Sequence, residues 1–483
     1  MKKRVTILFI GLLLTVFPGI ATGQVQNDSL LFYLRLAAKN NPSVMQRFTE
    51  YKAALEKIPQ VSALPDPELG IDAFLTPMEL VAGNQIGDLN LMQMFPWFGT
   101  LRAAKDEMSL MAKADYETFR EAKLQVFYDV QKSWYDLYNV QQNIRISEKS
   151  LDILTTLERL SLVRFRSGAT GNPGVTQSGT SMPEAGGSQV TASGSGSMNN
   201  MGGGQPQNNA SGSSSPATAR QGDEMGAGSG GSGLADLYRI RIGIAEMEND
   251  IAQLQSRHRS LTAYFNSLIN RPSLTGVSVP DTIIADTLSL SLNEVLDSML
   301  VNNPMIMMLD YERQSLDARK EMVTRMGYPM IGLGLNYSFI SPNAMSSSAM
   351  NGKDMIMPMA KITLPLYRKK YRSMQNEASL MEESAGYNRD AVSNSLEAEY
   401  YSALQSYQDA LRRIKLYSVQ LDLANRSLSI LLKSFASSGA DLTEILQIRQ
   451  QTLDYELKSV EAVTDCNTSI ARIRQLMASE QSF

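Results

Sequence analysis

The sequence predicts an α+β chain, mostly α, in which long antiparallel α-helical coiled-coil hairpins are combined with a few short strands. Three observations lead to this prediction. The triplet Asn40-Asn41-Pro42 recurs as Asn302-Asn303-Pro304, so the chain reads as a duplication. After each copy, apolar residues alternate with small or polar ones, as in a strand with one apolar face. The stretch from Leu101 to Arg166 then contains neither proline nor glycine, so it could form a helix of about 100 Å.

The N-terminus resembles an export signal. Basic residues at 2–4 precede an apolar run over 5–20, and a small-residue cleavage site closes residues 1–23, as in a secretory signal peptide. A retained membrane anchor is the alternative, but the run is shorter than the roughly 20 apolar residues of a spanning helix, and Pro18 interrupts it. Because Cys466 is the single cysteine, we expect neither an internal disulfide nor a lipidated cysteine behind the signal.

Charge and hydropathy narrow the class of protein. Without residues 1–23 the chain has 42 basic and 49 acidic residues, a net charge near −7. It shows no basic patch, so we expect no nucleic-acid partner. No later stretch approaches the 18 consecutive apolar residues of a spanning helix. An exported chain of this kind is periplasmic, secreted or a β-barrel.

The strand pattern predicts one β-hairpin in each repeat. Leu69 and Ile71 alternate with Gly70 and Asp72 in the first repeat. Strands of about ten residues are long enough to cross a bilayer when tilted, although a soluble hairpin fits the pattern equally well. Turns are expected over 76–85 and 341–354. The fourth strand, near 355–364, is the least regular, since it contains Pro358 and Lys361.

The predicted organisation has two repeats that differ in one place. The number of positions between matching residues of the two repeats is about 66 larger before the hairpin tip than after it. One helical hairpin therefore has an insertion, which is rich in Gly, Ser and Asn and is expected to be disordered. The first repeat is expected at 24–271, with a β-hairpin at about 66–96, a helical hairpin at about 101–271 and the insertion at 169–233. The second repeat is expected at 272–483, with a β-hairpin at about 328–365 and a helical hairpin at about 368–478.

The inventory of reactive residues argues against an enzyme. The single histidine, His258, and the single cysteine, Cys466, both fall in predicted helical arms, where a packing role is the ordinary expectation for the histidine. No catalytic residue and no cofactor is predicted. Met355, Met357 and Met359 alternate on one strand face and are weak candidates for a soft metal such as Cu(I) or Ag(I); the alternative is that they only fill apolar gaps. No metal ligand is therefore assigned.

The order of these motifs resembles the TolC family of outer-membrane efflux channels. The resemblance covers nearly all of the chain after residue 23 except the insertion. It rests on four features taken in order: Leu64-Pro65-Asp66-Pro67, Gln93-Met94-Phe95-Pro96-Trp97, Ser291-Leu292-Asn293-Glu294 ahead of Asn302-Asn303-Pro304, and two tips ending in Gly168 and Gly439.

The resemblance implies a homotrimer in the outer membrane of a Gram-negative bacterium. Each subunit would lend four strands to one transmembrane β-barrel and four helical arms to a periplasmic tunnel. The implied partners are a periplasmic adaptor protein, an inner-membrane transporter and outer-membrane lipid, in a tripartite efflux pump or a type I secretion system. Substrates would be small molecules or ions.

The resemblance also suggests residues for the two hairpin tips. Asp441 and Glu444 match an acidic pair that rings the tunnel entrance in the family, although the link from Gly439 is short; an ordinary helix cap with a capping box explains the same residues. Candidates for adaptor docking are Phe165, Gly168, Phe435 and Gly439. The insertion is either a tolerated loop or a tether or plug.

Three alternative functions stay open at this point. Leu64-Pro65-Asp66-Pro67 and the methionines resemble the heavy-metal branch of the family, yet that branch is often lipidated and this chain lacks the required cysteine. A periplasmic adaptor would carry a single helical hairpin between halves of a β-rich domain. A secreted coiled-coil structural protein would leave the strands unexplained.

Overall fold

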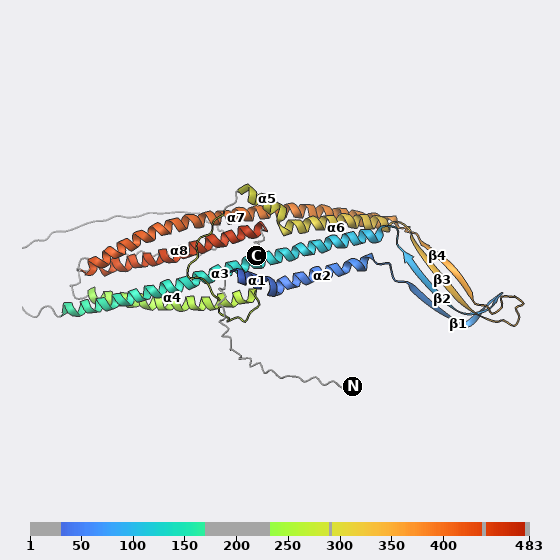
Figure 1. Cartoon of the computed structure of the whole chain (residues 1–483), viewed down its shortest axis with the longest axis horizontal. Coiled ribbons are helices and arrows are strands. Elements are labelled where there is room, and N and C mark those ends of the chain that lie inside the picture. Colours follow the sequence, from blue (N-terminus) through green and yellow to red (C-terminus); the bar gives the residue numbers. More distant parts are fainter. Residues whose placement is uncertain (1–29, 170–231, 289–291, 437–440, 479–483) are drawn as a thin grey trace, which may run out of the picture. The chain divides into compact units, whose positions relative to one another are not determined.

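The computed structural model describes four stretches of the 483-residue chain, namely 30–169, 232–288, 292–436 and 441–478. The predicted signal peptide and all but the ends of the predicted insertion lie outside them. The elements are α1 (Leu30–Asn40), α2 (Pro42–Ser62), β1 (Glu68–Leu80), β2 (Gly83–Phe95), α3 (Thr100–Ala169), α4 (Ser232–Leu268), α5 (Leu292–Asn302), α6 (Pro304–Met326), β3 (Met330–Ser341), β4 (Met355–Thr363), α7 (Arg368–Ala436) and α8 (Leu442–Leu476) (Figure 1). Two helices, a β-hairpin and two long helices thus occur twice in this order.

Helices make up most of the described residues, and two of them are very long. α3 has 70 residues and α7 has 69, so each extends about 100 Å at 1.5 Å per residue. Residues 150–248 form one compact unit, and the rest of the chain forms the other. Within the described stretches, no helix combines the length and the apolar character needed to cross a membrane.

The second asparagine of the repeated Asn-Asn-Pro sequence has the same role in both copies. Asn41 Oδ1 accepts hydrogen bonds from the backbone N–H groups of Ser43 and Val44, at 2.9 and 3.2 Å, and so caps α2. Its Nδ2 donates to the Leu268 carbonyl at the end of α4, at 2.7 Å. In the second copy, Asn303 caps α6 through the N–H of Met305 and donates to the Leu476 carbonyl at the end of α8, at 3.0 Å. Each asparagine therefore joins the start of one helix to the end of another.

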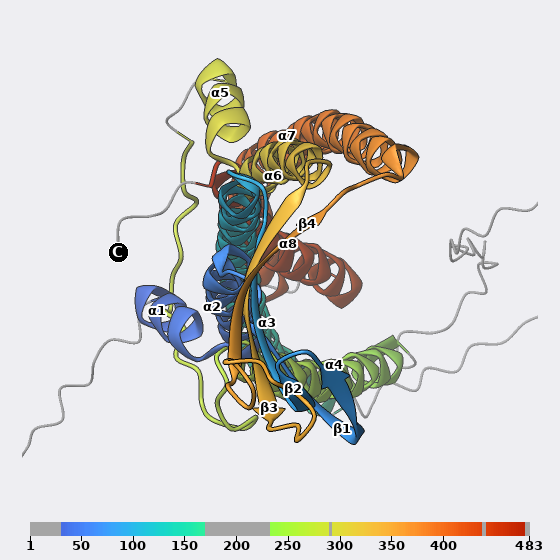
Figure 2. The ribbon, with the colours of Figure 1, turned by 90° about the vertical axis from the view of Figure 1, so that its right-hand side faces the viewer.

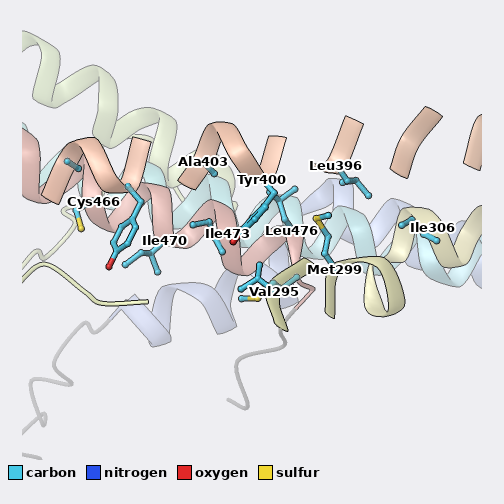
Figure 3. Packing of buried hydrophobic residues seen from close by; sticks show 13 residues of the cluster. Val295, Met299, Ile306, Leu396, Tyr400, Ala403, Cys466, Ile470, Ile473 and Leu476 are labelled. Carbon is cyan, nitrogen blue, oxygen red and sulfur yellow. The ribbon is translucent and has the colours of Figure 1, made fainter. Parts of the chain in front are cut away.

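Each copy has its own hydrophobic core, where its two short helices meet the middle of its first long helix and the C-terminal part of its second. In the first copy, Tyr33, Leu137 and Phe265 from α1, α3 and α4 are fully buried. In the second copy, Figure 3 shows Val295 and Met299 of α5 beside Tyr400 of α7 and side chains of α8. The buried residues of the second core are Val295, Met299, Ile306, Leu396, Tyr400, Ala403, Tyr407, Ala410, Cys466, Ile470, Ile473, Leu476 and Met477.

The segment between α4 and α5, residues 270–288, crosses both copies as an extended strap (Figure 2). Side chains of the helices satisfy its backbone. Tyr33 and Tyr138 hydroxyls accept from the N–H groups of Ser278 and Ile283, at 3.1 and 3.2 Å. In the second copy, the Tyr407 hydroxyl accepts from the N–H of Leu288 at 3.2 Å and Asn467 Oδ1 accepts from that of Asp286 at 2.8 Å. The strap is thus fixed to both copies by side-chain hydrogen bonds.

The strands form one antiparallel sheet in the order β1-β2-β3-β4. The first hairpin corrects the sequence prediction, because β1 and β2 each have 13 residues and continue through the expected turn at 76–85. The register shifts between Ala73 and Met78, so Pro77 lies in an irregularity of an outer strand. A proline there loses no ladder hydrogen bond, which is why a turn-like sequence is accommodated within a strand. In β4, Pro358 likewise lies in an outer strand, opposite Leu335.

Candidate functional site

The two faces of the sheet differ in character. Residues directly opposite one another in antiparallel strands point to the same side, so the register gives rows of side chains across the sheet. Apolar rows are Leu69-Leu91-Leu335-Pro358 and Ile71-Leu89-Tyr337-Ile356, and the alternate rows are Gly70-Asn90-Asn336-Met357, Asp72-Asp88-Ser338-Met355 and Glu68-Met92-Gly334-Met359. We call these the apolar face and the polar face.

The apolar face is uncovered in the single chain. Leu69, Ile71 and Ile356 are 63%, 71% and 60% exposed, and Ile362 is 63% exposed. Soluble monomers seldom leave contiguous apolar surface of this kind open to water. The sheet also has two outer strands, β1 and β4, whose free edges can pair with further strands.

Glycines let methionine side chains lie across the polar face. A Cβ atom at Gly332 would lie 2.6 Å from the sulfur of Met94. At Gly334 it would lie 2.9 Å from the Leu91 carbonyl oxygen, and 3.5 and 3.6 Å from the methyl groups of Met92 and Met359. At Gly334 the close backbone oxygen leaves no room for a side chain, whereas at Gly332 the flexible Met94 side chain would have to move, so the two glycines leave this space to the methionines.

The tip of the second helical hairpin carries two exposed carboxylates. Asp441 occupies the N-cap position of α8 with extended backbone, but its side chain makes no capping hydrogen bond. The capping-box interpretation is therefore wrong for this side chain: Asp441 has the position of a cap without the hydrogen bond. Leu442 and Ile445 are buried, and between them Glu444 is exposed. Among the described residues, neither carboxylate has an ion-pair partner.

The first hairpin tip, within the unit 150–248, differs in charge. Asp236 at the start of α4 lies 3.5 Å from Arg239, so its carboxylate is paired. Of the residues predicted to dock an adaptor, Phe165 and Gly168 lie in the last turns of α3 and a partly buried Phe435 lies in the last turn of α7. Gly439 lies outside the described residues. The structure thus places Phe165, Gly168 and Phe435 at helix ends.

Arg449 is a buried cation that the sequence interpretation overlooked. It is 4% exposed, two turns into α8, and neither Nε nor one terminal nitrogen has a hydrogen-bond partner. Burial lowers the pKa of its guanidinium, and Glu456 opposes that shift. Thr452, three residues further along the same buried face of α8, is fully buried. Heptad spacing from Leu442 already indicated that position 449 faces the partner helix, so the charge could have been found from the sequence.

A charged cleft of about 600 Å³ lies between α3, α7 and α8. Arg472 pairs with Glu399, and Arg413 pairs with Asp465 at 2.8 Å. Burial raises the pKa of Asp136 on α3, and Lys132 opposes the shift. Both ion pairs join α7 to α8, and the Arg472 guanidinium lies 5.3 Å from the centre of the Tyr128 ring of α3, so we assign the cleft to the packing of α3 against the second hairpin. Sequence spacing could not reveal it, because its residues are hundreds of positions apart.

The single cysteine and the single histidine both lie within helices, Cys466 in α8 and His258 in α4. Burial, followed by the charge of Asp286, raises the pKa of the Cys466 thiol to about 11, so the thiol stays protonated and unreactive at neutral pH. His258 is partly buried on α4. Within the described part of the chain, no three His, Cys, Asp or Glu side chains gather closely enough to hold a metal ion.

Comparison with known proteins gives a match in structure. No family model and no curated protein matches the sequence. The outer membrane protein VceC from Vibrio cholerae matches with a TM-score of 0.66 at 13% identity, over 93% of this chain and 96% of that one. The outer-membrane channel OprN gives 0.68 at 12%, over 93% and 90%. The open MtrE outer membrane channel of Neisseria gonorrhoeae gives 0.65 at 12%, over 93% and 88%.

The chain therefore has the fold of outer-membrane channels. This confirms the predicted fold class, with its long helical hairpins and small antiparallel sheet.

Proposed function

We propose that this chain is a member of the TolC family and is the outer-membrane channel subunit of a tripartite efflux pump or type I secretion system. The observation that carries this proposal is the four-stranded sheet, with one exposed apolar face and two free edges, on the same chain as helices of about 100 Å. The likeness to outer-membrane channels supports it.

The apolar face suits lipid, and the free edges suit a closed barrel. Every backbone N–H and C=O group in the hydrocarbon layer needs a partner, which an open sheet cannot provide. Three copies would supply twelve strands, with β4 of one copy pairing with β1 of the next. The polar face would then line the pore, as in known transmembrane barrels.

The helical hairpins would extend from the barrel into the periplasm. Their tips are where a periplasmic adaptor and an inner-membrane transporter would meet the channel, through Phe165, Gly168, Phe435 and Gly439. Asp441 and Glu444 would form the entrance: three copies would bring six carboxylates around the axis, attracting cations and opposing anions. Their exposure and lack of ion-pair partners among the described residues support this role.

A matched pair of substitutions tests the barrel directly. Leu335→Arg places a charge on the apolar face, and Asn336→Arg places it one residue further, on the polar face. If the apolar face meets lipid, L335R costs about 2–4 kcal/mol while N336R is tolerated. We expect L335R to lose the heat-sensitive trimer band in SDS–PAGE of outer-membrane fractions, and N336R to keep both this band and conductance in planar bilayers. A wild-type protein found only in the soluble periplasmic fraction would overturn the proposal.

A further inference from the structure

The methionines of the sheet are confined to one face. In the paired rows between Gly87 and Phe95 of β2, the polar face carries Met92, Met94, Met355, Met357 and Met359. The apolar face of the same rows carries leucine, isoleucine, phenylalanine and tyrosine but no methionine, and the polar face carries none of those four. A residue that merely filled apolar gaps would be expected on both faces.

The surroundings of these methionines are polar. Met355 shares its row with Asp72 and Asp88, Met357 shares its row with Asn90 and Asn336, and Met92 and Met359 share theirs with Glu68. Met355 and Met357 are 39% and 41% exposed, so their thioethers are open to solvent. A thioether exposed among carboxylates and amides contributes little to packing, and it keeps its ability to bind a soft metal ion.

Two thioether side chains are brought together over a glycine. Met92 and Met359 flank Gly334, and their methyl groups lie 3.5 and 3.6 Å from one point, the position that a Cβ would take there. The two methyl groups are therefore at most about 7 Å apart, within the range that rotation of these flexible side chains can close around one ion. Met357 is two residues from Met359 on the same face, about 7 Å along the strand.

We propose that Met92, Met359 and Met357 bind Cu(I) or Ag(I), a soft monovalent cation, as a substrate that passes along the polar face. Thioethers select such ions over Mg²⁺ or Ca²⁺, which take oxygen ligands. The carboxylates of Glu68, Asp72 and Asp88 outnumber the one cation of the paired rows, Lys361, so the face attracts cations. The transport role rests on the proposed channel function; the binding site does not.

The test is an Ag(I) titration of the purified protein in a chloride-free buffer. The variant M92L/M357L/M359L removes the three thioethers with little change in volume. The control M326L/M345L/M350L removes three exposed methionines outside the sheet. We expect the first variant to bind Ag(I) about tenfold or more weakly than the wild type, and the control to bind like the wild type. Equal binding by the wild type and M92L/M357L/M359L, or no binding by the wild type, would overturn the site.

Conductance separates this site from the channel function. In planar bilayers, Ag(I) should reduce the K⁺ current of the wild type and of the control, and leave that of M92L/M357L/M359L unchanged. A conducting protein that binds no Ag(I) would reject the site and keep the channel. An Ag(I)-binding protein without conductance would reject the channel and keep the site.

Discussion

The two return helices, α4 and α8, begin alike and then differ. Counted from the shared Ala-Asp-Leu sequence, Ile240 and Ile445 are matched, and both are fully buried. The next seam positions are Ile244 and Met247 in α4 but Arg449 and Thr452 in α8. The first tip thus has an apolar seam and a paired carboxylate. The second has a buried cation with two nitrogens that lack hydrogen-bond partners, and two carboxylates without ion-pair partners among the described residues.

This difference shows that duplicated hairpins can share a fold and differ in stability. Burying a charge without a partner costs several kcal/mol, and a matching apolar residue has no such cost. The start of α8 is therefore expected to open more readily than the start of α4. In a channel, the less stable hairpin is the one that needs less free energy to open locally and move.

The largest effect is expected when the arginine of the second hairpin is placed at the matching position of the first hairpin. Ile244→Arg should destabilise the start of α4 by about 2–4 kcal/mol, because the new charge has no partner in an apolar seam. Hydrogen exchange of peptides covering 235–250 measures this loss. The exposed neighbour Glu246 provides the control, and E246R should leave exchange unchanged. Equal exchange in both variants would show that the seam of α4 tolerates charge.

The reverse substitution should stabilise the second hairpin. Arg449→Ile replaces a buried cation that is incompletely hydrogen-bonded with the residue of the first hairpin, and a gain of about 1–3 kcal/mol is expected. Slower hydrogen exchange over the first three turns of α8 is the readout. Gln450→Ile at the next, exposed position should give no gain. Faster exchange in R449I would mean that Arg449 stabilises α8.

A smaller effect is expected where the two copies have equivalent contacts. Asn41→Ala and Asn303→Ala should each cost about 1–2 kcal/mol, since each removes a helix cap and a hydrogen bond to a helix-end carbonyl. Thermal unfolding of the two variants should show equal losses. Asn40→Ala and Asn302→Ala, at the adjacent positions, are the controls. A clear difference between N41A and N303A would break the equivalence of the two copies.

The smallest effect on stability is expected at the acidic tip. Asp441→Asn with Glu444→Gln should change stability by less than about 0.5 kcal/mol, since both side chains are exposed. The reversal potential in a salt gradient should nevertheless shift toward lower cation preference. Glu56→Gln with Asp281→Asn removes the same charge from exposed sites elsewhere and should leave the reversal potential unchanged. If both double variants behave alike, Asp441 and Glu444 do not line the entrance.

Local patterns in the sequence predicted much of the fold. The Asn-Asn-Pro triplet and the alternation at Ile331, Leu333 and Leu335 identified the repeat and the strands, because a helix cap and the alternation within a strand depend on residues close in the sequence. The turn at 76–85 was wrong, since Pro77 breaks a central strand but is tolerated at an outer one. The charged cleft depends on contacts between distant helices, which local patterns do not encode.

The strap between α4 and α5 has a consequence for symmetry. Separate single-copy chains would assemble a ring of six equal hairpins. In this chain, Tyr33, Tyr138, Tyr407 and Asn467 fix the strap to both copies, so the two copies of one chain cannot separate. In the proposed trimer, the two copies can then diverge while the ring still closes. A partner protein would face a threefold pattern of two unlike hairpins, and could bind one kind while leaving the other free to move.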